Sequence, residues 1–176
     1  MIQIRKGTFE TNSSSTHSIC ISKEPVTRYP RSVHFSLGRY GWEQDTVEDT
    51  ASYLYTGIME CTNAVQETFL ERIKNILAKH DIEATFEEER KDSYFYVDHG
   101  YELYDFLDMI TSNEDMLLRF LFSPKSCVYT GNDNGSDETD KCNCACPTYN
   151  DPDDDYKSKP HPYHNPEHFE YFYKGN

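Results

Sequence analysis

The sequence predicts an α+β fold: a small antiparallel sheet with about four helices, followed by an irregular Cys/His-rich C-terminal segment. Three patterns lead to this prediction. Short stretches near the start alternate between apolar and polar residues, as strands do, and four later stretches repeat apolar residues every three or four positions, as helices do. From Gly131 onward, Gly, Asn, Asp and Pro dominate and no apolar period remains. We therefore expect an α+β domain over residues 1–130 and an irregular acidic segment over 131–176, which zinc would order.

Three short strands are expected in the first forty residues. Ile2 and Ile4 alternate with polar residues, residues 17–21 alternate again, and residues 32–37 repeat the same period of two. Between the first two strands lies the run 11–16, whose Thr, Asn and Ser side chains favour bonding to nearby backbone over extending a ladder. We expect this run to be a structured loop.

Two helices should follow. Asp45 and Glu48 have the spacing of a capping box, which predicts a first helix over about residues 46–60. Asn63 and Gln66 repeat the capping pattern before a second stretch in which apolar residues recur at intervals of three and four. The second of these helices has the longer apolar stripe.

The next elements are a pair of strands, two more helices and a returning strand. Residues 82–86 and 94–97 flank a charged turn, which predicts an antiparallel pair. Helical spacing recurs over 103–110 and again over 116–121, with a Ser-Asn stop and cap between the two stretches. Residues 127–130 are expected to return as a strand.

The charge is strongly acidic and unevenly spread. The formal net charge is -14, yet residues 1–42 carry six Lys/Arg against two Asp/Glu, which leaves 11 against 29 in residues 43–176. This balance argues against direct binding of nucleic acid, which relies on cations displacing counterions, and favours a basic, nucleic-acid-binding protein as partner. A merely soluble acidic surface is the alternative. The candidate binding residues are Glu87, Glu88, Glu89, Asp151, Asp153, Asp154 and Asp155.

The first ten residues are polar and charged, without the apolar region of a secretory signal, and the most apolar stretch is far shorter than the ~20 residues that cross a bilayer. We therefore expect an intracellular protein with no membrane contact. In that reducing compartment cysteines act as thiols or metal ligands.

Closely spaced cysteines and histidines in a segment without an apolar core predict a zinc site, because metal binding can order such a chain. The spacing C-x-C-x-C differs from the usual C-x2-C, so a fourth ligand must come from elsewhere. A disordered tail and an oxidised cysteine pair are the alternatives, and Cys20 and Cys61 are expected to be buried small residues. The predicted zinc ligands are Cys142, Cys144 and Cys146, with Cys127 and His161 as leading candidates for the fourth.

A second candidate site involves histidines. The run from Asn12 to His17 is dense in hydroxyl and amide groups and lies in the one basic part of the chain, so it has the chemistry to hold a phosphate, although it lacks the glycines of a P-loop. His17, His34 and His99 are the candidate catalytic residues if the early strands lie beside residues 94–97. A simple turn and strand histidines partly exposed to solvent are the alternative interpretations.

Four stretches carry a resemblance to known proteins: Arg5-Lys-Gly-Thr-Phe-Glu-Thr-Asn-Ser-Ser-Ser-Thr-His-Ser18, Tyr40–Glu43, Ala51–Thr56 and Thr130–Asn134. They resemble segments of small proteins of phages and mobile elements of gut Firmicutes, over about three quarters of the chain and without the cysteine-rich tail. The resemblance brings no activity with it. By analogy it implies an inhibitor of host defence in the bacterial cytoplasm, such as an anti-CRISPR protein acting on a Cas9-type nuclease.

Together these observations predict a binding protein rather than an enzyme. Its acidic groups would take the place of phosphates on a host nucleic-acid-handling effector. The alternative is a metal- or phosphate-handling enzyme that uses the Asn12–His17 loop with His34 and His99.

Overall fold

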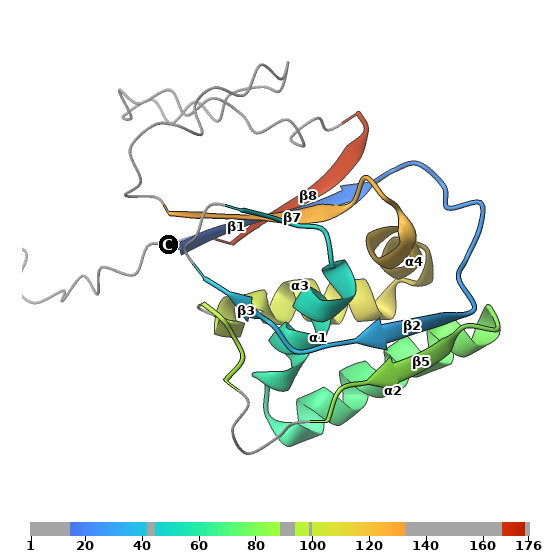
Figure 1. Ribbon diagram of the computed structural model, residues 1–176, viewed down its shortest axis with the longest axis horizontal. Coiled ribbons are helices and arrows are strands. Elements are labelled where there is room, and N and C mark those ends of the chain that lie inside the picture. Colours follow the sequence, from blue (N-terminus) through green and yellow to red (C-terminus); the bar gives the residue numbers. More distant parts are fainter. Residues whose placement is uncertain (1–14, 42–44, 89–93, 99, 133–166, 175–176) are drawn as a thin grey trace, which may run out of the picture.

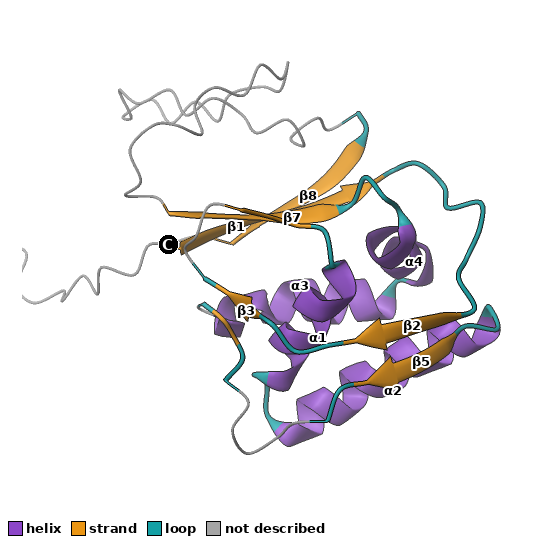
Figure 2. Cartoon of the chain, viewed as in Figure 1, coloured by secondary structure: helices purple, strands orange, loops and turns teal. Residues whose placement is uncertain are grey.

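The computed structural model describes residues 15–41, 45–88, 94–98, 100–132 and 167–174. Within these ranges it confirms the predicted α+β class, with four α-helices, one four-stranded antiparallel sheet and two small two-stranded sheets (Figures 1 and 2). The four-stranded sheet lies on one side of α1, α3 and α4, and the small β2–β5 sheet lies on the opposite side, next to α2 (Figure 1).

The four-stranded sheet draws its strands from both ends of the chain. Its order is β4 (Asp45–Val47), β7 (Cys127–Asn132), β1 (Ser15–Ser22) and β8 (Phe169–Lys174), with every pair antiparallel. β1 therefore has neighbours on both edges. The expected strands at 17–21 and 127–130 are both confirmed.

One face of this sheet packs against the apolar core. Ile19 of β1 lies opposite Val128 on β7 and Phe172 on β8, and all three belong to or pack against the main apolar cluster. Phe172 also packs against Phe106, with ring centroids 5.7 Å apart. Because side chains alternate between the two faces of a strand, the neighbours of Ile19 on β1 point away from the helices.

Helix α1 (Thr50–Met59) is the central element of the molecule, since every residue from Thr50 to Ile58 is buried. A helix buried on all sides must satisfy its own polar groups. The Thr50 hydroxyl donates to the carbonyl of Phe120 at 2.7 Å, and the Thr56 hydroxyl donates to the carbonyl of Ser52 at 2.7 Å.

Three further helices and one 3₁₀ turn surround α1. They are α2 (Asn63–Lys79), η1 (Gly100–Leu103), α3 (Tyr104–Ser112) and α4 (Glu114–Phe122). The apolar stripe predicted for the second helix is buried at Phe69, Ile73, Ile76 and Leu77. Asn113 caps α4 as expected, because its side-chain oxygen accepts the backbone N–H of Met116 at 3.1 Å.

The predicted antiparallel pairing of residues 82–86 with 94–97 is wrong. β5 (Glu83–Phe86) pairs in parallel with β2 (Ser32–Phe35), and β6 (Tyr96–Val97) pairs in parallel with β3 (Arg39–Tyr40). The two later strands thus lie against a single earlier stretch of chain. Stacking of the Phe35 and Phe86 rings, with centroids 4.7 Å apart, accompanies the first of these pairings.

Two predicted caps are also corrected. The capping box of Asp45 and Glu48 does not form, because the β-branched residues Thr46 and Val47 pair with β7 instead. The residue that caps α1 is Asp49, whose side chain accepts the Ser52 N–H at 3.0 Å.

At α2, Thr62 is the capping residue and Asn63 is already helical. Gln66 nevertheless acts at this junction. Its side-chain amide donates to the carbonyls of Met59 and Cys61 at 2.8 and 2.9 Å, which ties the start of α2 to the end of α1.

The segment 131–176, predicted to be irregular, contains β8, which is an edge strand of the main sheet. Ser15 and Thr16, expected to lie in a loop over 11–16, belong to β1 instead, and residues 11–14 lie outside the described residues. The strand expected at Ile2 and Ile4 lies outside the described residues.

Candidate functional site

His17 is completely buried beneath the sheet, and it belongs to a chain of polar aromatic contacts. Its Nδ1 lies 2.8 Å from the hydroxyl of Tyr53 on α1. The Tyr53 ring packs edge-on against Tyr40, with centroids 5.2 Å apart, and the Tyr40 hydroxyl donates to the Ser52 hydroxyl at 2.6 Å. This chain links β1, α1 and β3.

The phenols of this chain are held in their neutral form. Burial raises the pKa of Tyr53 well above its usual value, with smaller contributions from the negative charge of Glu60 and from Tyr40. Burial also raises the pKa of Tyr40, although its bond to Ser52 acts in the opposite direction. Neutral phenols serve as hydrogen-bonding groups here, which is a structural task.

The candidate catalytic histidines do not converge among the described residues. His34 is exposed on β2, where its Nδ1 lies 2.9 Å from the Thr85 hydroxyl on β5. His17 is buried in a different sheet. His99 lies outside the described residues, and the two histidines that are described, His17 and His34, do not share a site.

Cys127 is the one predicted zinc ligand that the structure describes, and it is buried in β7. The other four, Cys142, Cys144, Cys146 and His161, lie outside the described residues. Within the described ranges no three His, Cys, Asp or Glu side chains are grouped so that they could hold a metal ion.

Glu87, predicted to be a binding residue, has a structural role. Its carboxylate accepts the backbone N–H of Leu37 at 2.8 Å, its own N–H donates to the carbonyl of Phe35 at 2.8 Å, and its carbonyl accepts the Tyr55 hydroxyl at 2.8 Å. Glu87 therefore fixes the bend that follows β2. Glu88 beside it is exposed, whereas Glu89 and the four aspartates from Asp151 to Asp155 lie outside the described residues.

Three exposed carboxylates that sequence reasoning did not single out are better candidates for a binding surface. Glu67 and Glu71 lie four residues apart on α2, and Asp105 lies on α3. In the described part of the chain none of the three forms an ion pair. The sequence does carry a signal for Glu67 and Glu71, because they are two like charges four residues apart in a predicted helix, where such charges repel each other.

The cations nearby are largely engaged elsewhere. Arg72 of α2 contacts Asp108 of α3 at 2.6 Å, and Lys79 of α2 contacts Glu114 of α4 at 2.7 Å. These pairs join neighbouring helices, so they leave the negative charge of Glu67, Glu71 and Asp105 facing solvent.

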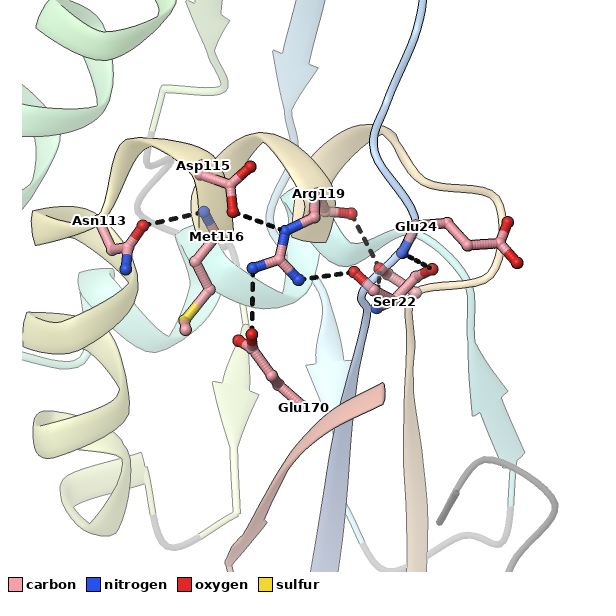
Figure 3. Close-up of polar contacts among 8 residues, drawn as sticks. Ser22, Glu24, Asn113, Asp115, Met116, Arg119 and Glu170 are labelled. Atoms are coloured by element: carbon pink, nitrogen blue, oxygen red, sulfur yellow. Dashed lines mark hydrogen bonds and ion pairs between the residues drawn. The ribbon is translucent and has the colours of Figure 1, made fainter. Parts of the chain in front are cut away.

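Arg119 forms the most extensive polar network that the structure describes (Figure 3). Its side chain is only 8% exposed. It donates to Asp115 at 2.9 Å, to the carbonyl of Ser22 at 2.8 Å and to Glu170 at 3.2 Å, while its own carbonyl accepts the Ser126 hydroxyl at 2.8 Å. The network joins α4 to β1 and β8, and nothing in the apolar run around Arg119 predicts it.

Comparison with known proteins identifies no relative: no family model, no curated protein and no solved structure matches this chain. Among the described residues, no helix has the length and apolar character needed to cross a membrane.

Proposed function

We propose that this chain is a binding protein that presents a carboxylate-rich surface to a basic, nucleic-acid-handling protein. The observation that carries the proposal is the surplus of exposed carboxylates without cationic partners. The net charge is -14, and Glu67, Glu71 and Asp105 are exposed on packed helices without an ion pair in the described part of the chain.

A channel that binds nucleic acid is lined with Lys and Arg, so it attracts fixed negative charges in the same way that it attracts phosphates. Glu67 and Glu71 suit this role because α2 is anchored on its other side by buried apolar residues. Such a rigid array loses little conformational freedom on binding.

The resemblance to phage and mobile-element proteins supports a host defence effector in the bacterial cytoplasm as the partner. A Cas9-type nuclease fits this class, since it holds its guide–target heteroduplex in a positively charged channel. The protein would then act by occupying the channel and excluding nucleic acid.

The test is the association rate of the purified protein with a Cas9-type nuclease, measured at 50, 150 and 500 mM salt with and without target DNA. We expect association to slow steeply with salt, because exposed charges are screened beyond about 8 Å at physiological ionic strength. DNA in the channel should block binding.

Two charge-reversal variants with the same change in net charge locate the surface. The pair Glu67→Lys and Glu71→Lys should slow association by roughly tenfold or more, whereas the pair Glu83→Lys and Glu88→Lys on the β5 side should change it by less than about twofold. A loss confined to the second variant would move the surface to β5. If no binding occurs, or if neither salt nor either variant changes it, the proposed function is wrong.

A further inference from the structure

Two cysteines from distant parts of the chain lie directly opposite each other in the four-stranded sheet. Cys20 is on β1 and Cys127 is on β7, and the antiparallel register pairs them. The neighbouring pair, Ile19 and Val128, belongs to the core beneath the sheet. Because side chains alternate between faces, both cysteines point to the face away from the helices.

Both side chains are buried and both are thiols. Cys20 is 0% exposed and Cys127 is 3% exposed. Cys61, the other cysteine in the described part of the chain, follows α1 and does not belong to the sheet. Cys20 and Cys127 are therefore each other's nearest neighbours among the described thiols, and because both are buried, a reagent in solution reaches them only when the strand opens locally.

The spacing of the ladder allows a bond between them with a small adjustment. Cβ atoms of residues directly opposite on antiparallel strands lie about 4.5–5.5 Å apart, and a disulfide takes about 3.5–4.5 Å. Closing the bond thus needs a shift of roughly one ångström. A disulfide formed under such strain is more easily reduced again than a relaxed one.

We propose that Cys20 and Cys127 form a reversible thiol–disulfide pair that a small-molecule disulfide, such as glutathione disulfide, oxidises. The product joins β1 covalently to β7. Cys127 should react first, because it begins β7 next to a turn, whereas Cys20 lies inside the longer central strand. Local opening of the strand end would limit the rate.

The exchange takes place in two balanced steps. The Cys127 thiol loses its proton, and the thiolate attacks one sulfur of glutathione disulfide, which breaks that S–S bond and releases one glutathione thiolate. The Cys20 thiol then loses its proton and attacks the Cys127 sulfur of the mixed disulfide, which releases the second glutathione thiolate. The two protons end on the two glutathione molecules, so two protein thiols are oxidised while one glutathione disulfide is reduced.

Tryptic mapping of the full chain after incubation with glutathione disulfide tests the proposal directly. Trypsin places Cys20 in peptide 7–23, Cys127 in peptide 126–141, Cys61 in peptide 40–72 and the three C-x-C-x-C cysteines in peptide 142–157. We expect peptides 7–23 and 126–141 to be joined, and the link to disappear with dithiothreitol. Linkage of either peptide only to 142–157, or glutathione adducts without a link, would overturn the proposal.

Matched variants distinguish a disulfide between Cys20 and Cys127 from oxidation of other cysteines. Cys127→Ala and Cys20→Ala should each abolish the link, and Cys61→Ala should leave it intact. Oxidation should also raise the Tm of the wild type by several degrees, because a bond that closes a loop of roughly 100 residues restricts the unfolded chain. An unchanged Tm, or an equal rise in Cys127→Ala, would contradict a covalent lock between β1 and β7.

Discussion

Arg119 on α4 and Glu170 on β8 form an ion pair, with Nη2 and Oε1 3.2 Å apart, that joins a helix to an edge strand 51 residues further along the chain. The same guanidinium donates to the carbonyl of Ser22 on β1 (Figure 3). One side chain thus holds the edge strand, the central strand and a helix together. Edge strands have only one neighbouring strand, so contacts of this kind decide how firmly they are attached.

Replacing Arg119 by Met should destabilise the protein by about 2 kcal/mol, measured as the free energy of unfolding in urea. Removing one partner of a fully buried pair costs about 3–5 kcal/mol, and the smaller value applies because the Glu170 side chain is 30% exposed. Asp115→Asn is the control. Its side chain is 77% exposed, so we expect a change below about 0.5 kcal/mol, and a loss equal to that of Arg119→Met would contradict the network.

Tyr53→Phe should lower stability at neutral pH by about 1 kcal/mol, because His17 Nδ1 loses its bond to the phenol. Burial raises the pKa of Tyr53 above its usual value of 10.0, so the folded state disfavours the phenolate. The stabilising effect of the neutral phenol is complete below pH 10 and is lost as the pH rises above that value. The stability difference between wild type and Tyr53→Phe should therefore narrow between pH 10 and 11.

Urea titrations across this range measure the narrowing. Tyr94→Phe provides the control, since the Tyr94 ring is 68% exposed, and its stability should run parallel to that of the wild type. A constant difference between wild type and Tyr53→Phe across the range would show that the phenol does not resist ionisation in the folded state.

Helices and caps that depend on residues a few positions apart could be predicted from the sequence. The stripe from Phe69 to Leu77 defines α2 because residues three and four apart share one face of a helix, and Asn113 caps α4 because its side chain reaches the next turn. The parallel pairing of β5 with β2 has no such local signal. It depends on strands about fifty residues apart, where no turn geometry fixes the partner or its direction.

In the candidate site too, properties set by composition or nearby residues could be predicted, and roles set by distant contacts could not. The surplus of negative charge is a property of composition and could be predicted from the sequence. The difference in role between Glu87, which is structural, and Glu88, which is exposed, could not. Glu87 becomes structural only because Leu37, 50 residues earlier, brings a backbone N–H to its carboxylate. His17 likewise looked like a strand histidine open to solvent until Tyr53 and the sheet enclosed it.

Cys61 should react slowly with iodoacetamide. Burial raises the pKa of its thiol, and the negative charge of Glu60 raises it further, so less of the reactive thiolate is present near neutral pH. We expect peptide 40–72 to be alkylated more slowly than free glutathione at pH 7.5, as followed by mass spectrometry. Glu60→Gln should speed the reaction by removing the neighbouring charge, and an equal rate in the two proteins would mean that burial alone controls the thiol.

The adjacent residues Glu87 and Glu88 provide the sharpest test of the division between structural and surface carboxylates. Glu87→Gln keeps the size of the side chain but removes the charge that strengthens its bond to the Leu37 N–H, so we expect a loss of about 1 kcal/mol in the free energy of unfolding. Glu87→Ala removes the acceptor altogether and should cost about 2 kcal/mol. Glu88 is exposed, so Glu88→Gln and Glu88→Ala should each stay within about 0.5 kcal/mol of wild type.

Partner binding should not depend directly on the charge at either of these two positions. Because Glu87 faces Leu37 rather than a partner, partner binding by the two Glu87 variants should fall only in proportion to the fraction of unfolded protein. Urea titration together with the binding assay at one salt concentration checks this. Partner binding that is lost in Glu87→Gln while the protein remains fully folded would place Glu87 in the interface and contradict its structural role.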